Sequence, residues 1–125
     1  MQNYHKLKVW EKAHALAVAV HALTEHVPRK NNTELIDQLR RAALSIPANI
    51  VEGAGSATDK DFARFLRIAF ASANELEYHL QFAADTGAIP QAVSGPRQAE
   101  VIEIRKMLMG LIRRATGQPR PPASV

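Results

Sequence analysis

The chain of 125 residues contains no cysteine. Without thiols there can be no disulfide framework, no cysteine-ligated zinc and no cysteine nucleophile. Aromatic residues are also scarce, at 6% of the chain. No segment approaches the roughly 20 uninterrupted apolar residues of a membrane span, and the N-terminal residues form no apolar stretch of signal-peptide length. We therefore expect a cytoplasmic protein that has no association with a membrane.

The sequence also lacks the motifs of the common enzyme classes. It has no glycine-rich phosphate loop and no HExxH zinc motif, and its histidines do not occur at chelating spacings. His14 and His21, for example, would lie about 10 Å apart along a helix axis, too far to share one ion. We therefore expect a non-enzymatic protein with no metal and no cofactor.

What the sequence does contain is helical periodicity. No segment shows sustained alternation of apolar and polar residues, whereas four segments carry apolar residues at intervals of three and four. These segments cover residues 8 to 26, Thr33 to the turn at residues 53–55, Thr58 to just before Gly87, and Pro96 to about Ala115. The pattern predicts an all-α protein, an antiparallel up-down four-helix bundle over residues 1–116, followed by a flexible tail over residues 117–125.

The ends of these segments carry helix signals. Asn31, Asn32 and Thr33 offer N-cap oxygens to the second helix, and Thr58 with Asp61 resembles a capping box. Gly87 is expected to end the third helix. The Gly95-Pro96 pair should interrupt the chain, because proline suits the first position of a helix better than its interior. The fourth helix is therefore expected to begin at Pro96.

The second segment, QLRRAALSIPANIVEGAG, is the most unusual part of the chain. Pro47 lies inside it and cannot donate a hydrogen bond to the carbonyl of Ala43, so the helix is expected to bend there. The expected core face consists of Leu35, Leu39, Ala42, Ile46 and Ile50.

A second apolar row on this helix consists of Leu44, Ala48 and Val51, placed roughly opposite the core row. A bundle helix needs only one buried face, so the second row predicts a subunit interface. The alternative is a broad core that covers both rows.

Polar residues also recur on the second and third helices. They are Arg40, Arg41, Ser45, Asn49, Glu52, Glu75 and Glu77. Glu77 falls near the apolar face, and a carboxylate there needs a partner, for which Arg40 or Arg41 is the candidate. We interpret the set as a structural network between helices. The alternative is a metal or acid-base site built on Glu52, Glu75 and Glu77, although the Glu-x-x-His pairs of bundle di-metal sites are missing.

Basic residues gather near the two ends of the chain, which has a formal net charge of +4. In an antiparallel bundle the start of the first helix and the end of the fourth lie at the same pole, so these residues could form one nucleic-acid-binding surface. They are Lys6, Lys8, Lys12, Arg105, Lys106, Arg113 and Arg114. The alternative is a solubilising surface. Because aromatic residues are few, binding would be to the phosphate backbone.

The chain resembles the four-helix-bundle proteins encoded in intervening sequences of bacterial 23S ribosomal RNA genes, also labelled ribosomal-protein-like. The resemblance rests on LKVWEKAHAL, on QLRRAALSIPANIVEGAG, on DFARFLRIAFASANELEYHL and on MLMGLIRR. It implies a homopentameric ring. The family includes the accessory variability determinant of diversity-generating retroelements, which implies partners such as structured RNA or a reverse transcriptase complex.

Two functions are consistent with these observations. The first is a non-enzymatic, homopentameric protein that binds RNA or another nucleic acid through its basic surface, as a ribonucleoprotein accessory. The second is a homopentameric protein scaffold with no nucleic-acid role.

Overall fold

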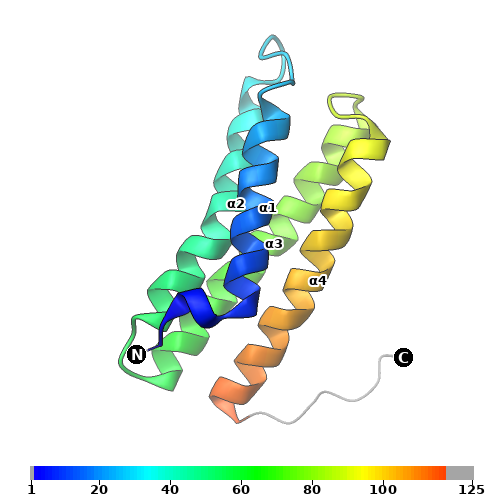
Figure 1. The fold of residues 1–125 in the computed structure, drawn as a ribbon. Coiled ribbons are helices and arrows are strands. Elements are labelled where there is room, and N and C mark those ends of the chain that lie inside the picture. Colours follow the sequence, from blue (N-terminus) through cyan, green and yellow to red (C-terminus); the bar gives the residue numbers. More distant parts are fainter. Residues whose placement is uncertain (1, 118–125) are drawn as a thin grey trace, which may run out of the picture.

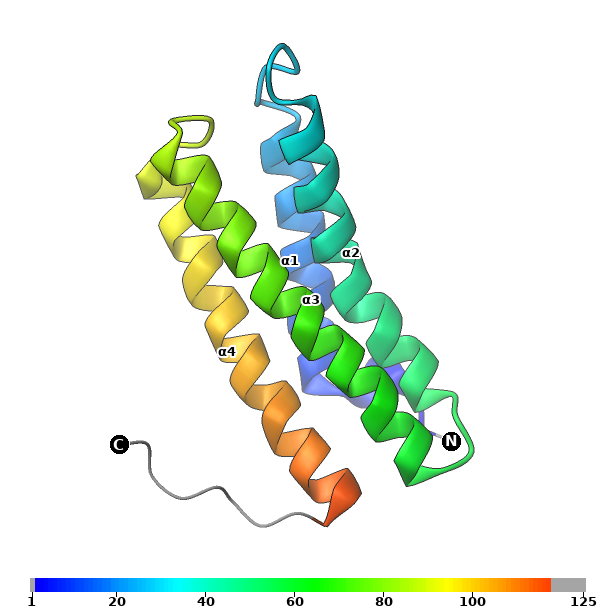
Figure 2. The same cartoon turned by 180° about the vertical axis from the view of Figure 1, so that it is seen from behind.

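The structure is a computed structural model that describes residues 2–117, and within them it is helical with no strand. Figure 1 shows four long helices that run alternately up and down, and Figure 2 shows the same arrangement from behind. The all-α, antiparallel four-helix bundle predicted from the periodicity is therefore confirmed. The elements are a short 3-10 helix η1 (Tyr4–Lys6), α1 (Lys8–Thr24), α2 (Thr33–Ala54), α3 (Asp59–Asp85) and α4 (Gln91–Thr116).

The four helices do not pack equally. α3 packs closely against both α2 and α4, whereas α1 packs against α2 and more sparsely against α4. α1 and α3 are diagonal partners with no direct helix contact of note. The seam between α1 and α4 is therefore the most loosely packed of the four seams between neighbouring helices.

The buried face of α2 is the one that the sequence predicted, except at one position. On α2 the side chain of Ile36 is fully buried, and Leu35, which was expected in the core, is only half-buried. Leu39, Ala42, Ile46 and Ile50 are buried as predicted. Both Leu35 and Ile36 are apolar and lie near the core direction, so periodicity alone could not choose between them.

The helix ends match the sequence signals in part. The Thr58 side chain caps α3 by accepting a hydrogen bond from the backbone N–H of Asp61 at 3.1 Å, as predicted. Gly87 has a φ of 78°, a left-handed conformation that glycine adopts at no steric cost, just after α3 ends. Asn32 precedes α2, but its side chain does not cap it. Instead its amide donates to the Pro28 carbonyl at 3.0 Å.

Both internal prolines lie inside continuous helices. α2 runs unbroken through the buried Pro47. The expected interruption at Gly95-Pro96 is wrong, because α4 begins at Gln91 and contains Pro96. A proline ring inside a helix crowds both the residue before it and the carbonyl four residues earlier, and the missing Cβ of Gly95 relieves the first of these conflicts. Pro96 therefore removes one hydrogen bond near the start of α4 without breaking the helix.

The structure describes the predicted bundle but only the first residue of the predicted tail. Gly117, with a φ of 68°, ends α4 in a left-handed conformation. The remainder of the predicted tail, residues 118–125, lies outside the described residues. No helix in the described part of the chain combines the length and apolarity needed to cross a membrane.

Candidate nucleic-acid interface

Three of the seven predicted basic residues surround one hollow. Lys6 and Lys8 flank the N-cap residue of α1, and Arg114 lies in the last turn of α4. They line a cavity of about 310 Å³ at the end of the bundle where α1 begins and α4 ends. Its remaining walls come from Leu7, Val9, Met107, Gly110 and Leu111. All three basic side chains are exposed, so the hollow combines an apolar floor with cationic groups that an anion can reach.

Local folding explains why the two lysines face outward. Leu7 separates them, is half-buried and packs against the core. Its backbone N–H donates to the carbonyl of Tyr4 at 2.9 Å, which closes the η1 turn. Because Leu7 points inward, its neighbours Lys6 and Lys8 are left at the surface.

The other basic residues are placed differently. Lys12 forms an ion pair with Glu103 of α4 at 3.0 Å, which bridges the α1–α4 seam. Arg105 is half-buried and is held by Glu77 and by the side-chain oxygen of Asn74, the latter at 2.9 Å. Lys106 is exposed and Arg113 is half-buried. The seven residues therefore do not form a single uniform surface.

The ion pair of Glu77 corrects one prediction. Its partner is Arg105 of α4, not Arg40 or Arg41 of α2. The requirement that a carboxylate near the core be paired is met, but by the helix on the other side of α3. A helical wheel fixes the face on which Glu77 lies, and it does not say which neighbouring helix covers that face.

The predicted polar network is divided into separate contacts. The Ser45 hydroxyl contacts the Ser72 hydroxyl of α3 at 2.8 Å, and the Asn49 amide donates to the Ser45 carbonyl at 2.8 Å. Glu75 pairs instead with His79 on its own helix at 3.2 Å. Arg41 and Glu52 are exposed. The Ser45–Ser72 contact ties α2 to α3 two residues before Pro47. The Asn49–Ser45 contact stays within α2 and spans Pro47, where the hydrogen-bond ladder of the helix is incomplete.

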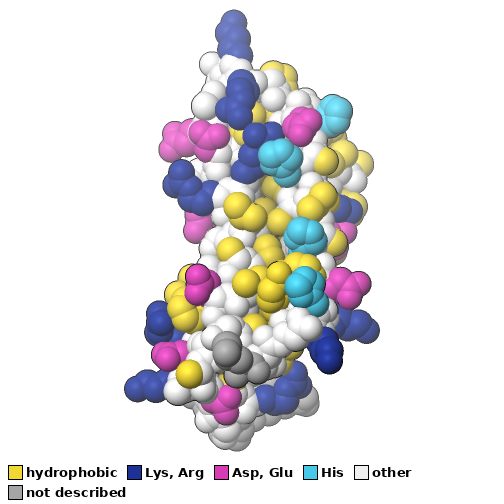
Figure 3. Space-filling view, turned by 60° about the vertical axis from the view of Figure 1, so that its left-hand side comes forward, with side chains coloured by type: hydrophobic (Ala, Val, Ile, Leu, Met, Phe, Trp, Pro, Cys, Tyr) yellow, Lys and Arg dark blue, Asp and Glu magenta, His cyan; other side chains and the backbone are white. Residues whose placement is uncertain are grey.

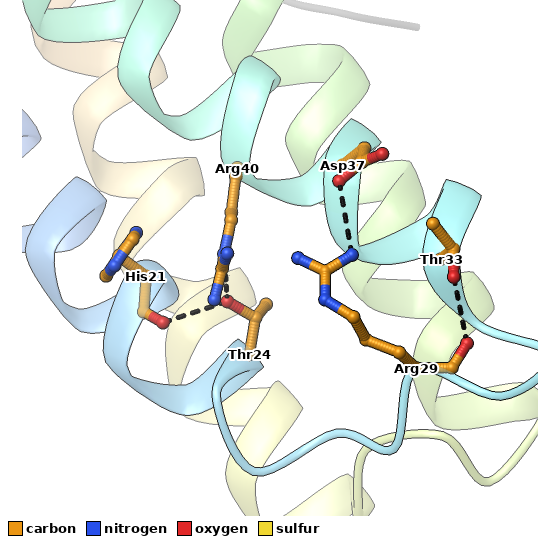
Figure 4. Close-up of polar contacts among 6 residues, drawn as sticks. All are labelled: His21, Thr24, Arg29, Thr33, Asp37 and Arg40. Atoms are coloured by element: carbon orange, nitrogen blue, oxygen red, sulfur yellow. Dashed lines mark hydrogen bonds and ion pairs between the residues drawn. The ribbon is translucent and has the colours of Figure 1, made fainter.

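Arg40 makes a contact that the sequence did not indicate. Its Nε donates to the hydroxyl of Thr24 at 2.8 Å, and that hydroxyl donates to the His21 carbonyl at 2.8 Å. Figure 4 shows this chain of contacts between α1 and α2, beside the Arg29–Asp37 ion pair of 3.7 Å. Thr24 is only 1% exposed. A buried hydroxyl therefore fixes the guanidinium at the edge of the α1–α2 surface.

The second apolar row of α2 lies at the surface of the chain. Leu44 is 64% exposed, Ala48 is exposed and Val51 is half-buried. The alternative of a broad core covering both rows is therefore wrong. Leu44 and Val18 of α1 help to line a hollow of about 280 Å³ between His14 and His21. Figure 3 shows histidines beside hydrophobic side chains on one face of the molecule.

Four rings cluster at the start of the chain, which sequence reasoning missed. Trp10 and His14 stack with their centroids 5.0 Å apart, and Tyr4 and His5 stack at 4.1 Å. Tyr4 also meets Trp10 edge-on at 4.9 Å. The spacing of Trp10 and His14 by four residues signals their contact, but nothing in the sequence indicates that η1 folds back onto them. The cluster holds η1 in place and with it Lys6.

The acidic residues proposed as an alternative metal site do not meet. Within residues 2–117, no three His, Asp or Glu side chains lie close enough together to hold a metal ion.

Comparisons with known proteins agree with this architecture. The family model for the 23S rRNA-intervening sequence protein matches residues 5–110. A crystal structure of a protein with unknown function from the S23 ribosomal protein family of Bacteroides thetaiotaomicron superposes with a TM-score of 0.76 and 30% identity. The match covers 84% of this chain and 98% of that one. A comparison with the curated proteins found no match. The chain therefore belongs to the 23S rRNA-intervening sequence protein family.

Proposed function

We propose that this protein is a non-enzymatic, cytoplasmic, homo-oligomeric RNA-binding protein, a ribonucleoprotein accessory that recognises the phosphate backbone of structured RNA. The observation that carries the proposal is the hollow at the α1–α4 pole, where Lys6, Lys8 and Arg114 converge. Lysine and arginine at the rim of an open surface are the groups that neutralise phosphates and release their counterions. The family takes its name from intervening sequences of 23S rRNA, and RNA is the polyanion that we propose.

The charge distribution favours the α1–α4 side over the rest of that pole. In the first turns of α3, which is diagonal to α1, Asp59 and Asp61 offset Lys60 and Arg64, so the net charge there is zero. The exposed Lys106 lies on α4, on whose last turn Arg113 and Arg114 also lie. A phosphate backbone would therefore run along the end of α4 and the start of α1, away from the carboxylates of α3.

Assembly would strengthen this binding. We propose a homopentameric ring, in which the exposed apolar row of α2 is covered by a neighbouring subunit. A pentamer would present five copies of the basic hollow and five times the net charge of +4. Binding of one RNA at several hollows raises the overall affinity through effective concentration. A reverse transcriptase complex is the kind of assembly in which such a ring would serve as the accessory.

The test is fluorescence anisotropy of a labelled structured RNA, titrated with the protein across a salt series with duplex DNA as competitor. We expect binding that weakens steeply with salt and resists the DNA. The variant Arg113→Glu with Arg114→Glu should bind about tenfold or more weakly, and its slope of log K against log salt should be shallower by about 2. Lys6→Glu with Lys8→Glu should behave in the same way.

The matched control is Lys60→Glu with Arg67→Glu, which changes the charge equally at exposed positions of α3. We expect less than about a threefold loss of affinity, from long-range electrostatics alone. Equal losses in the site and control variants would mean that net charge, and not the hollow, governs binding.

The second candidate function is a protein scaffold whose positive charge is incidental. The observation that favours it is the apolar surface formed by Leu44 and Val18, which are 64% and 56% exposed. A surface of this kind is typical of a protein interface. A stable ring that binds no RNA even at low salt would support the scaffold and overturn the RNA-binding proposal.

A further inference from the structure

Two aromatic side chains are exposed at the end of the bundle opposite the basic hollow. Tyr78 is 62% exposed and Phe82 is 45% exposed on the last turns of α3. Their ring centroids lie 6.4 Å apart, with the ring planes inclined at 49°. Together with the start of α2 they form a groove of about 380 Å³. Neither ring contributes to the buried core, so packing of the bundle does not explain them.

Apart from Leu35, the other residues that line this groove are polar. Asn31 and Gln38 contribute side-chain amides, and Glu34 contributes a carboxylate. Aromatic rings that accommodate proline, amide donors for backbone carbonyls and an acidic group for a basic side chain are the features by which grooves recognise polyproline II segments. The groove therefore fits a proline-rich peptide that contains an arginine.

This chain contains such a peptide. Residues 118–122 read Gln-Pro-Arg-Pro-Pro and follow directly on the end of α4, beyond the described residues. Three prolines favour the extended polyproline II conformation, which lowers the entropy cost of docking. Arg120 has the charge that Glu34 would bind. We propose that the groove formed by Tyr78, Phe82 and Glu34 binds the segment of residues 118–122 from a second copy of this chain.

Distance along the bundle requires the second copy. The Ser94 hydroxyl donates to the Leu80 carbonyl at 2.7 Å, which places the start of α4 level with the groove. From Ser94 to Gly117 the helix advances about 34 Å. The five steps along the chain from Gly117 to Pro122 span at most about 18 Å when fully extended. The prolines of a chain therefore cannot reach that chain's own groove.

The contact would be heterologous, because the tail at one end of a subunit meets the groove at the other end of its neighbour. Repetition of such a contact gives a ring where the rotation closes. It involves neither the basic hollow nor Leu44, so it does not depend on RNA binding.

The test is photo-cross-linking of the full chain with p-benzoylphenylalanine introduced at position 123, next to the prolines. Unlabelled protein and protein labelled with heavy nitrogen are unfolded together, refolded into mixed assemblies, irradiated and analysed by mass spectrometry. We expect cross-links between the tail and residues 31–38 or 78–82 that join a light chain to a heavy one. Cross-links that join only chains of the same label, or that map elsewhere, would overturn the proposal.

Variants identify the groove as the site. Tyr78→Ser with Phe82→Ser should lower the cross-link yield by at least about fivefold, since aromatic anchors dominate such contacts. Val93→Ser is the matched control, because Val93 is 43% exposed near the same end of the bundle but does not line the groove. Its yield should equal that of the unchanged chain. Equal yields in all three proteins would refute the assignment.

A charge exchange tests the ionic contact separately. Glu34→Arg should lower the yield because it places two positive charges together, and Glu34→Arg combined with Arg120→Glu should restore it. If Glu34→Arg and the double variant give the same low cross-link yield, the Glu34–Arg120 contact is excluded. Circular dichroism of each exposed-site variant establishes that the helices are intact.

Discussion

Two glycines inside helices have opposite surroundings, and the difference gives a test at the residue scale. A Cβ on Gly53 would lie 3.0 Å from both Phe62 Cδ1 and Phe65 Cβ of α3, whereas a Cβ on Gly110 of α4 would meet nothing within 4 Å. Gly53 therefore lies where α2 and α3 approach each other closely near their connecting turn. The atom Phe65 Cβ is fixed to its backbone and cannot move aside.

We predict that Gly110→Ala stabilises the protein by about 0.5–1 kcal/mol, because alanine costs less conformational entropy in a helix. Gly53→Ala gains the same amount but overpacks the contact with α3, which costs about 1–3 kcal/mol. We therefore expect a net loss at Gly53. Denaturation by urea, followed by circular dichroism, measures both. A Gly53→Ala protein as stable as Gly110→Ala would show that the two helices can separate at no cost.

A second prediction at the residue scale concerns Thr24, whose side chain is buried. Its hydroxyl holds Arg40 and the His21 carbonyl at once. We predict that Thr24→Val, which keeps the shape and removes the hydroxyl, lowers the free energy of unfolding by about 1–2 kcal/mol. Thr86→Val is the control, because Thr86 is exposed and its hydroxyl bonds only within its own turn, at 3.0 Å from the Phe82 carbonyl. That variant should change stability by less than about 0.5 kcal/mol. Equal effects would mean that the Arg40 contact contributes nothing.

At the scale of the helices, the sequence predicted all four elements because their apolar periodicity is strong. Seven of the eight predicted helix boundaries agree with the structure to within about two residues. The start of α4 was missed because Pro96 was assigned its usual position, at the start of a helix. Gly95 relieves part of the steric conflict, because its missing Cβ makes a helical conformation before proline less costly.

Pro96 therefore provides a prediction for α4 as an element. It is exposed at the sixth position of the helix, where it leaves the Ala92 carbonyl without its helical donor. Pro96→Ala restores that bond and should stabilise the protein by about 1–3 kcal/mol. Pro90→Ala is the control, because Pro90 precedes the helix and its nitrogen is outside the hydrogen-bond ladder. Amide exchange at Val93 and Ser94 should slow in the first variant only. Faster exchange after Pro96→Ala would show that the proline fixes the start of α4.

At the scale of the whole molecule, the candidate site was less predictable than the fold. The sequence indicated which pole would gather positive charge, since an antiparallel topology brings the two chain ends together. It could not show that Arg105 is engaged by Glu77 or that Lys12 pairs with Glu103, because both contacts depend on which helices are neighbours. The sequence also did not indicate the aromatic cluster around Trp10, because its contacts require η1 to fold back onto α1.

The apolar row of α2 gives the prediction that concerns assembly. We expect the unchanged chain to sediment as a pentamer and Leu44→Glu to sediment with the mass of one chain. Leu44 is 64% exposed within the subunit, so glutamate there is solvated in the separated chain and should change its stability by less than about 0.5 kcal/mol. In the ring the same carboxylate would be buried without a partner, which costs several kcal/mol. Val51→Glu should act in the same direction.

Val93→Glu is the control for this experiment, since it adds the same charge at an exposed apolar position of α4 that lies outside the proposed α2 interface. Its assembly should be unchanged. Separation of the ring into single chains should also weaken RNA binding, because one RNA can then engage only one basic hollow at a time. A shallower salt dependence of Leu44→Glu, with its helices intact and its basic residues untouched, would therefore connect assembly to binding. A Leu44→Glu protein with the sedimentation of the unchanged chain would instead place the subunit interface elsewhere, and the exposed row of α2 would then be left for another partner.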